Sequence, residues 1–248
     1  MTGTVFLVGA GPGASDLLTV RAARLLGEAS VVWYVALVGP DILALAPQAR
    51  LIPVGKRAGR PSMDQRLIGR LLVRMALRHR VVVRLKGGDP HLFGRATEEF
   101  EACRAAGVPI ATVPGITAAF AAASALGVSL TRRGAARSVT FVTPTVGRGQ
   151  STDDHWAKAA AAAETAVIYM GAREAAHVAT ALSARGAPMD WPAVMVESAS
   201  LPQERMAAGS LSQLAALAAQ VGPGPVLLIL GEAARSAVEA LTLARAAA

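Results

Sequence analysis

Residues 80–95 read RVVVRLKGGDPHLFGR, and this stretch decides the fold. Val81, Val82, Val83 and Leu85 form a β-branched apolar run, which is typical of a parallel strand covered on both faces of its sheet. The run stops at residues 87–90, where two adjacent glycines leave the backbone amides open to a ligand. In open α/β sheets, ligands bind beyond the carboxyl ends of strands. The stretch therefore predicts a ligand-binding loop, although the two glycines alone would also fit an ordinary strand–turn–helix junction.

The composition predicts a globular protein with a large core. The chain has 248 residues, of which 53% are hydrophobic and 17% are charged, so it can form one large or two small domains. Its net charge of +8 indicates an anionic partner, which could be a nucleic acid, a membrane surface or a polycarboxylate.

Lysine is rare in this chain, which uses arginine for most of its positive charge. The three lysines are Lys56, Lys86 and Lys158, against 22 arginines. Lys56 and Lys86 both lie beside glycine-rich loops, and lysine and arginine are not interchangeable where a proton must be transferred. Codon bias with three surviving lysines explains the totals but not this placement.

Several features indicate a cytoplasmic protein without a metal centre. The single cysteine, Cys103, allows no internal disulfide and is expected to pack inertly in a helix. No set of Cys and His residues has metal-ligand spacing, and the first residues lack the basic start of a signal peptide. The uncharged run 105–131 contains two prolines and three glycines, so we do not expect it to cross a membrane.

The first elements resemble a nucleotide-binding unit but depart from its fingerprint. A strand at 4–8 ends in Gly9-Ala-Gly-Pro-Gly13, and Asp16 is expected to cap the helix that runs to about residue 27. The glycine spacing is G-x-G-x-G, and the second strand, 31–34, is followed by Val35 rather than by an acid. A standard dinucleotide site is therefore not predicted.

The remaining elements alternate between strands and helices in two sets that divide near residue 134. We expect an N-terminal α/β domain at 1–134 and a C-terminal α/β domain at 135–248. The first set continues with a strand at 50–54, a helix at 62–79, a helix at 95–106 and a strand at 110–113. The second set comprises strands at 138–143, 165–169, 193–197, 206–208 and 225–230, and helices around Trp156, at 172–185, at 210–219 and from 232 onward.

Seven motifs occur in the order found in one enzyme family. They are VGAGPGASDLLT (8–19), VGKRAG (54–59), RLKGGDPHLFGR (84–95), VPGITAA (113–119), SVTFVT (138–143), VIYMG (167–171) and PVLLILGE (225–232). With these motifs the chain resembles the tetrapyrrole methylases over essentially its whole length, and most of all the uroporphyrinogen-III C-methyltransferase branch.

The resemblance implies a homodimer in which two α/β domains of the tetrapyrrole methylase type hold S-adenosyl-L-methionine in the cleft between them. The cofactor, which leaves as S-adenosyl-L-homocysteine, would contact residues that match the family's motifs: Pro12, Gly87, Gly88, Asp89, Leu92, Thr117, Ala118, Met170 and Ala199. Lys56 would be the catalytic residue, as a proton donor. The N-terminal domain would serve the tetrapyrrole and proton transfer, and the C-terminal domain would complete the cofactor cleft.

The implied reaction is the transfer of two methyl groups to uroporphyrinogen III, which yields precorrin-2 for sirohaem or cobalamin synthesis. The eight carboxylates of the substrate account for the many arginines without a nucleic acid. One branch of the superfamily methylates the ribose of RNA, but the VGKRAG and RLKGGDP motifs and an aromatic content of 4% argue against that activity here.

The chain departs from the family at positions expected to face the substrate. Val35 stands where the family has an aspartate assigned as proton acceptor, and Arg132 replaces a histidine. Pro144-Thr145 replaces Gly-His, and His91 replaces a phenylalanine, which makes His91 a candidate for a relocated base. These changes leave a second hypothesis open, namely a paralogue that binds the cofactor and a tetrapyrrole but has an altered substrate or weak activity.

Overall fold

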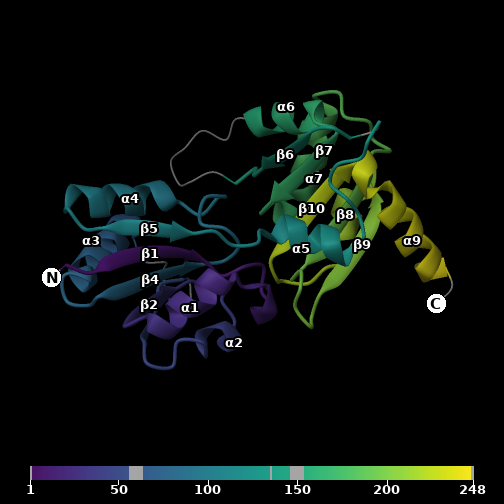
Figure 1. The fold of residues 1–248 in the computed structure, drawn as a ribbon. Helices are drawn as coiled ribbons and strands as arrows, with labels where there is room; N and C mark the ends of the chain where they lie inside the picture. Colours follow the sequence, from purple (N-terminus) through teal and green to yellow (C-terminus); the bar gives the residue numbers. More distant parts are fainter. Residues whose placement is uncertain (1, 56–63, 135, 146–153, 247–248) are drawn as a thin grey trace. The chain divides into compact units, whose positions relative to one another are not determined.

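A computed structural model describes residues 2–55, 64–134, 136–145 and 154–246. The chain forms two compact units, Met1–Ala118 and Ala119–Ala248, each with its own five-stranded sheet (Figure 1). The expected boundary at residue 134 assigned the helix after residue 117 to the first domain, whereas all of this helix except its first residue, Ala118, belongs to the second unit.

The first sheet is parallel throughout and has the order β3-β2-β4-β1-β5. Its strands are β1 (Thr4–Gly9), β2 (Val31–Tyr34), β3 (Arg50–Pro53), β4 (Val81–Lys86) and β5 (Ile110–Val113). The helices are α1 (Val20–Glu28), α2 (Pro40–Leu43), α3 (Gln65–Ala76) and α4 (Ala96–Ala105), with a short 3-10 turn, η1 (Ser15–Leu17), before α1. Strand β4 lies at the centre of this sheet, and both of its faces are covered, as the sequence predicted.

Each face of the first sheet packs against its own pair of helices. Val83 and Leu85 of β4 belong to the cluster that includes Leu26 of α1 and Ile42 of α2. Val82 belongs to the opposite cluster, which includes residues of α3 and α4. Because successive side chains of a strand alternate between faces, Arg84 and Lys86 lie on the same face as Val82, under α3 and α4.

The first helix is capped by a different residue from the one expected. Thr19 is the N-cap of α1, and its hydroxyl accepts a hydrogen bond of 3.2 Å from the backbone N–H of Ala22. Asp16 lies in the preceding 3-10 turn, so it is too early in the chain to cap α1. The helix begins only where the turn ends, and a threonine hydroxyl satisfies one of its free N–H groups.

The second sheet is mixed and has the order β6-β7-β10-β8-β9. Its strands are β6 (Val139–Val142), β7 (Thr165–Tyr169), β8 (Pro192–Glu197), β9 (Arg205–Ser210) and β10 (Val226–Gly231). Strands β7 and β8 are both antiparallel to β10, so they run in the same direction and their carboxyl ends share one edge of the sheet.

Helices cover both faces of the second sheet and build two apolar clusters. The helices are α5 (Ala118–Ala125), α6 (His155–Ala162), α7 (Ala175–Ser183), α8 (Leu214–Ala218) and α9 (Arg235–Ala246), with 3-10 turns η2 (Ala172–Glu174), η3 (Leu211–Gln213) and η4 (Glu232–Ala234). The alanines of α5 pack in a cluster with Val167 of β7, Val194 of β8 and Ile229 of β10. This packing explains why α5 belongs to the second unit.

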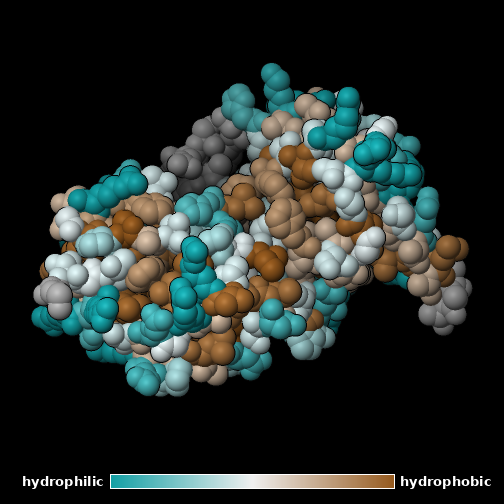
Figure 2. Space-filling model, viewed as in Figure 1, coloured by the Kyte–Doolittle hydropathy of each residue, from teal (hydrophilic) through white to brown (hydrophobic). Residues whose placement is uncertain are grey.

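The surface mixes hydrophobic and hydrophilic residues, and Figure 2 shows brown and teal side chains interspersed over the face in view. Exposed large hydrophobic residues include Val20, Leu37, Phe120 and Leu243. In the described ranges, every helix is too short or too polar to span a lipid bilayer.

Candidate functional site

The loops that follow β1, β4 and β5 meet at the carboxyl edge of the first sheet. Gly11 and Gly88 exchange backbone hydrogen bonds in both directions, with N···O distances of 3.3 Å and 2.7 Å. A Cβ atom on Gly115 would lie 2.2 Å from the carbonyl oxygen of Gly88, and one on Gly9 would lie 2.6 Å from the backbone of Gly115. Only glycine lets these three loops approach so closely.

Asp89 fastens the loop after β4 to the loop after β5. Its Oδ2 accepts a hydrogen bond of 2.9 Å from the backbone N–H of Gly115, and its Oδ1 accepts one of 2.8 Å from the N–H of His91. Each carboxylate oxygen can accept a further bond, so Asp89 retains capacity for a ligand. The structure thus adds a structural task to a residue expected to bind the cofactor.

The expected cofactor residues of the first unit are partly accessible around this loop junction. Pro12, Gly87, Gly88, Asp89, Leu92 and Ala118 are half-buried, and Thr117 is 8% exposed. Gly88 has a φ of +66°, which favours glycine, and a Cβ on Gly87 would lie in ordinary van der Waals contact with Leu37 at 3.6 Å. Half-buried backbone groups beside apolar side chains suit a ligand that has both polar and apolar parts, as S-adenosylmethionine does.

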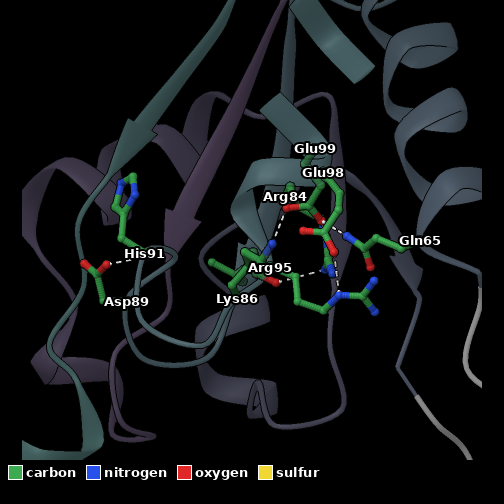
Figure 3. Close-up of polar contacts among 9 residues, drawn as sticks. Gln65, Arg84, Lys86, Asp89, His91, Arg95, Glu98 and Glu99 are labelled. Atoms are coloured by element: carbon green, nitrogen blue, oxygen red, sulfur yellow. Dashed lines mark hydrogen bonds and ion pairs between the residues drawn. The ribbon is translucent and has the colours of Figure 1, made fainter. Parts of the chain in front are cut away.

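A buried ion cluster lies directly beneath the same loop. The side chains of Arg84, Lys86 and Gln65 converge on the carboxylate of Glu99 (Figure 3). Arg84 Nε donates to Glu99 Oε1 at 2.9 Å, Gln65 Nε2 donates to the same oxygen at 3.1 Å, and Lys86 Nζ donates to Oε2. Glu99 is fully buried, and burial lowers the pKa of Lys86 from its ordinary value although Glu99 acts in the opposite direction.

The second unit places its two expected cofactor residues at one edge of its sheet. Met170 follows β7 and Ala199 follows β8, two strands whose carboxyl ends share that edge. Met170 is 51% exposed, whereas Ala199 is 6% exposed. Met170 has a φ of +58°, and Ser198 and Ser200, on either side of Ala199, have φ values of +51° and +71°. Left-handed non-glycine residues of this kind cluster at functional sites.

Glu197 organises the turn that contains Ala199. It is the last residue of β8 and is 4% exposed. Its two carboxylate oxygens accept hydrogen bonds of 2.7 Å from the backbone N–H groups of Gly222 and Gly224. The same carboxylate therefore joins the 198–200 turn to the loop that precedes β10.

The positions that depart from the family have different surroundings. Val35 is half-buried and packs against the cluster that contains Leu26 and Ile42. His91 is exposed and its ring stacks on Phe100 with a centroid distance of 6.2 Å. The Thr145 hydroxyl donates to the carbonyl oxygen of Met170 at 3.2 Å, so this altered position lies at the second unit's expected cofactor edge.

Two further residues singled out in the sequence are Lys56 and Cys103. Lys56, the expected catalytic residue, lies outside the described residues. Cys103 is fully buried, and burial raises the pKa of its thiol to about 11, in agreement with inert packing. Among the residues that the structure describes, no group of three His, Cys, Asp or Glu side chains is placed to hold a metal ion.

Sequence reasoning missed the two buried glutamates, Glu99 and Glu197. The signal for Glu99 was a pair of cations, Arg84 and Lys86, inside an otherwise apolar strand, because buried charges require a partner. The signal for Glu197 was a single carboxylate at the end of an otherwise apolar strand, PAVMVE.

The chain is similar in sequence to known proteins over most of its length. The family model of tetrapyrrole (corrin/porphyrin) methylases matches residues 4–215. The uroporphyrinogen-III C-methyltransferase of Paracoccus denitrificans is 46% identical over 237 residues, which are 95% of this chain and 83% of that protein. The protein of the same name from Pseudomonas aeruginosa is 43% identical over 96% of this chain and 97% of its own length.

A solved structure of a similar protein has the same fold as this chain. The uroporphyrin-III C-methyl transferase of Thermus thermophilus, complexed with S-adenyl homocysteine, superposes with a TM-score of 0.83 at 41% identity, covering 94% of this chain and 100% of that one. Sequence and fold therefore agree, and this chain belongs to the family of tetrapyrrole (corrin/porphyrin) methylases.

Proposed function

We propose that this protein is an S-adenosylmethionine-dependent C-methyltransferase that converts uroporphyrinogen III to precorrin-2. The observation that carries the proposal is the glycine-lined junction of the β1, β4 and β5 loops, held closed by Asp89 and found in a chain 46% identical to a uroporphyrinogen-III C-methyltransferase. The Thermus thermophilus relative with S-adenyl homocysteine supports the same cofactor.

Bound S-adenosylmethionine would supply an electrophilic methyl group to a pyrrole carbon of the substrate. Pro12, Gly87, Gly88, Asp89, Leu92, Thr117 and Ala118 of the first unit, together with Met170 and Ala199 of the second, would hold this cofactor. Small residues let backbone groups bind it directly, and the thioether of Met170 gives it a soft apolar contact. The protein's main contribution is alignment of the methyl group with the attacking carbon.

Proton transfer would fall to side chains of the first unit. Lys56 is our candidate for the proton donor, and His91, which is exposed beside the cofactor loop, is a candidate base in place of the aspartate missing at residue 35. Exposed arginines among the 22 of this chain would provide bidentate partners for the eight substrate carboxylates. We also propose that the protein is cytoplasmic and acts as a homodimer.

One assay tests the proposal. Purified protein is mixed with S-adenosylmethionine and freshly reduced uroporphyrinogen III, and the products are analysed by mass spectrometry. A product two methyl groups heavier than the substrate is the expected result. Cofactor binding without any methylated product would instead support the paralogue with altered substrate or weak activity, which the changes at Val35, Arg132 and Pro144-Thr145 make the second candidate.

A further inference from the structure

Lys86 links the core of the first sheet to the expected cofactor loop. It is the last residue of β4, and its backbone carbonyl accepts a hydrogen bond of 2.7 Å from the N–H of Ala10, in the loop after β1. Gly87, Gly88 and Asp89 follow it directly. Any movement of Lys86 would therefore shift both loops at the carboxyl edge of the sheet.

The side chain of Lys86 is buried beneath α4. Lys86 is 4% exposed, and its ammonium group contacts the carboxylate of Glu99 in the first turn of α4. Residues 86 and 99 are the two ends of the segment that contains Gly87, Gly88, Asp89 and Leu92. The ion pair thus closes the base of the cofactor loop, while Asp89 fastens its tip to Gly115.

The segment between Lys86 and Glu99 has a strained backbone, so it needs contacts that hold its ends in place. Phe93 and Arg95 have φ values of +53° and +54°, which are unfavourable for side chains of this size. A Cβ atom on Gly94 would lie 2.4 Å from the carbonyl oxygen of Pro90. A strained turn persists only where its surroundings hold both ends in place.

The charge of Glu99 can be neutralised by Arg84 alone, so Lys86 is not needed for charge balance in this cluster. Glu99 is the only carboxylate that contacts Arg84 and Lys86 among the described residues, so two cations share one anion. Arg84 alone would leave Glu99 paired one to one, with Gln65 as an additional donor. A second buried cation raises the cost of desolvation, so its presence calls for a reason beyond stability.

The choice of lysine at residue 86 also fits a closely packed ion pair with Glu99. Every other cation of the first unit's described residues is an arginine, although lysine occupies this buried site. The ammonium group is a compact donor on an unbranched stem, whereas a guanidinium is larger and planar. Arginine at residue 86 would have to displace Glu99 or the end of β4 in a region without spare volume.

We propose that Lys86 and Glu99 are positioning residues, whose buried ion pair sets the path of the 87–92 loop and so its fit to S-adenosylmethionine. This inference rests on the proposed function, because the loop is a cofactor loop only if the protein binds that cofactor. Neither side chain contacts the cofactor in this scheme, and both act through the backbone of Gly87, Gly88 and Asp89.

Lys86→Met provides the sharpest test because the variant retains a long unbranched side chain and a neutral Arg84–Glu99 pair. Calorimetry with S-adenosylhomocysteine should show a Kd about 10–100-fold higher than that of the wild type, as expected when the loop path that fits the ligand is populated only about 1–10% of the time. Hydrogen exchange in the free protein should be about tenfold faster at the Gly88 amide, which bonds to Gly11, and unchanged at amides in the middle of β1.

Two further variants separate positioning from charge and from general stability. Lys86→Arg keeps the charge and should fail to restore the wild-type Kd. Glu101→Gln removes an exposed carboxylate from α4, the helix that contains Glu99, and should leave the Kd and the exchange rates unchanged.

The outcomes distinguish failure of this inference from failure of the proposed function. A lower melting temperature of Lys86→Met with wild-type Kd and wild-type exchange at Gly88 would mean that the ion pair only stabilises the fold. Absence of S-adenosylhomocysteine binding by the wild type would overturn the proposed function. In that case faster exchange at Gly88 would still establish the control of the loop by Lys86, and unchanged exchange would overturn both.

Discussion

The backbone N–H of Gly115 donates a 2.9 Å hydrogen bond to the carboxylate of Asp89. This bond joins the loops after β4 and β5, which are separated in the sheet by β1. Asp89 therefore has two tasks in our proposal, because it shapes the site and lies among the residues that would contact the cofactor.

Asp89→Ala should weaken S-adenosylmethionine binding because it removes an acceptor for two backbone N–H groups at the loop junction. Loss of hydrogen bonds to a charged group costs roughly 1.5–3 kcal/mol. Calorimetry on the purified variant measures the affinity, and Asp41→Ala, which removes an exposed acid from α2, is the control. Unchanged affinity in a folded variant would place the cofactor elsewhere.

Lys56→Ala should reduce turnover more than cofactor affinity, since the resemblance assigns this lysine to proton transfer. Initial rates of methylation and the Kd of S-adenosylhomocysteine are measured on the same preparation. Lys158→Ala, which removes an exposed lysine of α6, is the matched control. Unaffected turnover combined with earlier melting would show that Lys56 is structural.

Val35→Asp should raise the methylation rate if proton abstraction at this position limits the reaction. A positioned general base contributes roughly 10²–10⁴-fold. Val35 is half-buried, so an aspartate there keeps access to water while losing apolar contacts with its cluster. Val35→Asn introduces a side chain with the shape of aspartate but without a basic carboxylate, so it should not increase the methylation rate. A slower and less stable Val35→Asp enzyme would rule out the missing base.

Glu197→Gln should destabilise the second unit by about 1–3 kcal/mol, because an amide nitrogen would face one of two backbone N–H donors. Gly222→Ala should have a similar effect, since its Cβ would lie 2.7 Å from Glu197 Oε1. Gly39→Ala is the control, because no atom lies within 4 Å of the corresponding Cβ position. Equal urea midpoints for all three variants and the wild type would contradict the role of this carboxylate.

Glu164 should make stability depend on pH on the acid side. Its carboxylate accepts hydrogen bonds from the backbone N–H groups of Arg137 and Ser138, and these lower its pKa from the ordinary 4.5. A carboxyl group whose pKa is lower in the folded state stabilises the fold above 4.5, and this contribution is lost as the pH falls through the folded-state value.

Thermal melts of the wild type and Glu164→Gln at several pH values measure this contribution. The difference in melting temperature should be largest near pH 7 and should shrink below about pH 4.5. A difference that is constant across this range would mean that the charge of Glu164 does not contribute.

The sequence by itself determined several local elements of both units. The apolar run 81–85 predicted a parallel strand covered on both faces, and β4 (Val81–Lys86) confirms this prediction, because such an apolar β-branched run is typical of a strand buried on both sides. The strands at 31–34, 110–113 and 165–169 also agree with β2, β5 and β7 to the residue. The ordered motifs were sufficient to identify the family, which the comparisons confirm.

Features that join distant residues were decided only by the tertiary structure. The sequence does not say that Glu99 lies opposite Arg84 and Lys86, or that Glu197 reaches Gly222, because these contacts depend on how helices and loops pack on the sheets. Helix α5 shows the same limit: its alanines give it no distinct apolar side, so the sequence could not indicate which sheet it packs against. Local patterns fix elements through backbone geometry, whereas buried charge pairs and unit boundaries arise from packing between elements, which periodicity along one segment does not contain.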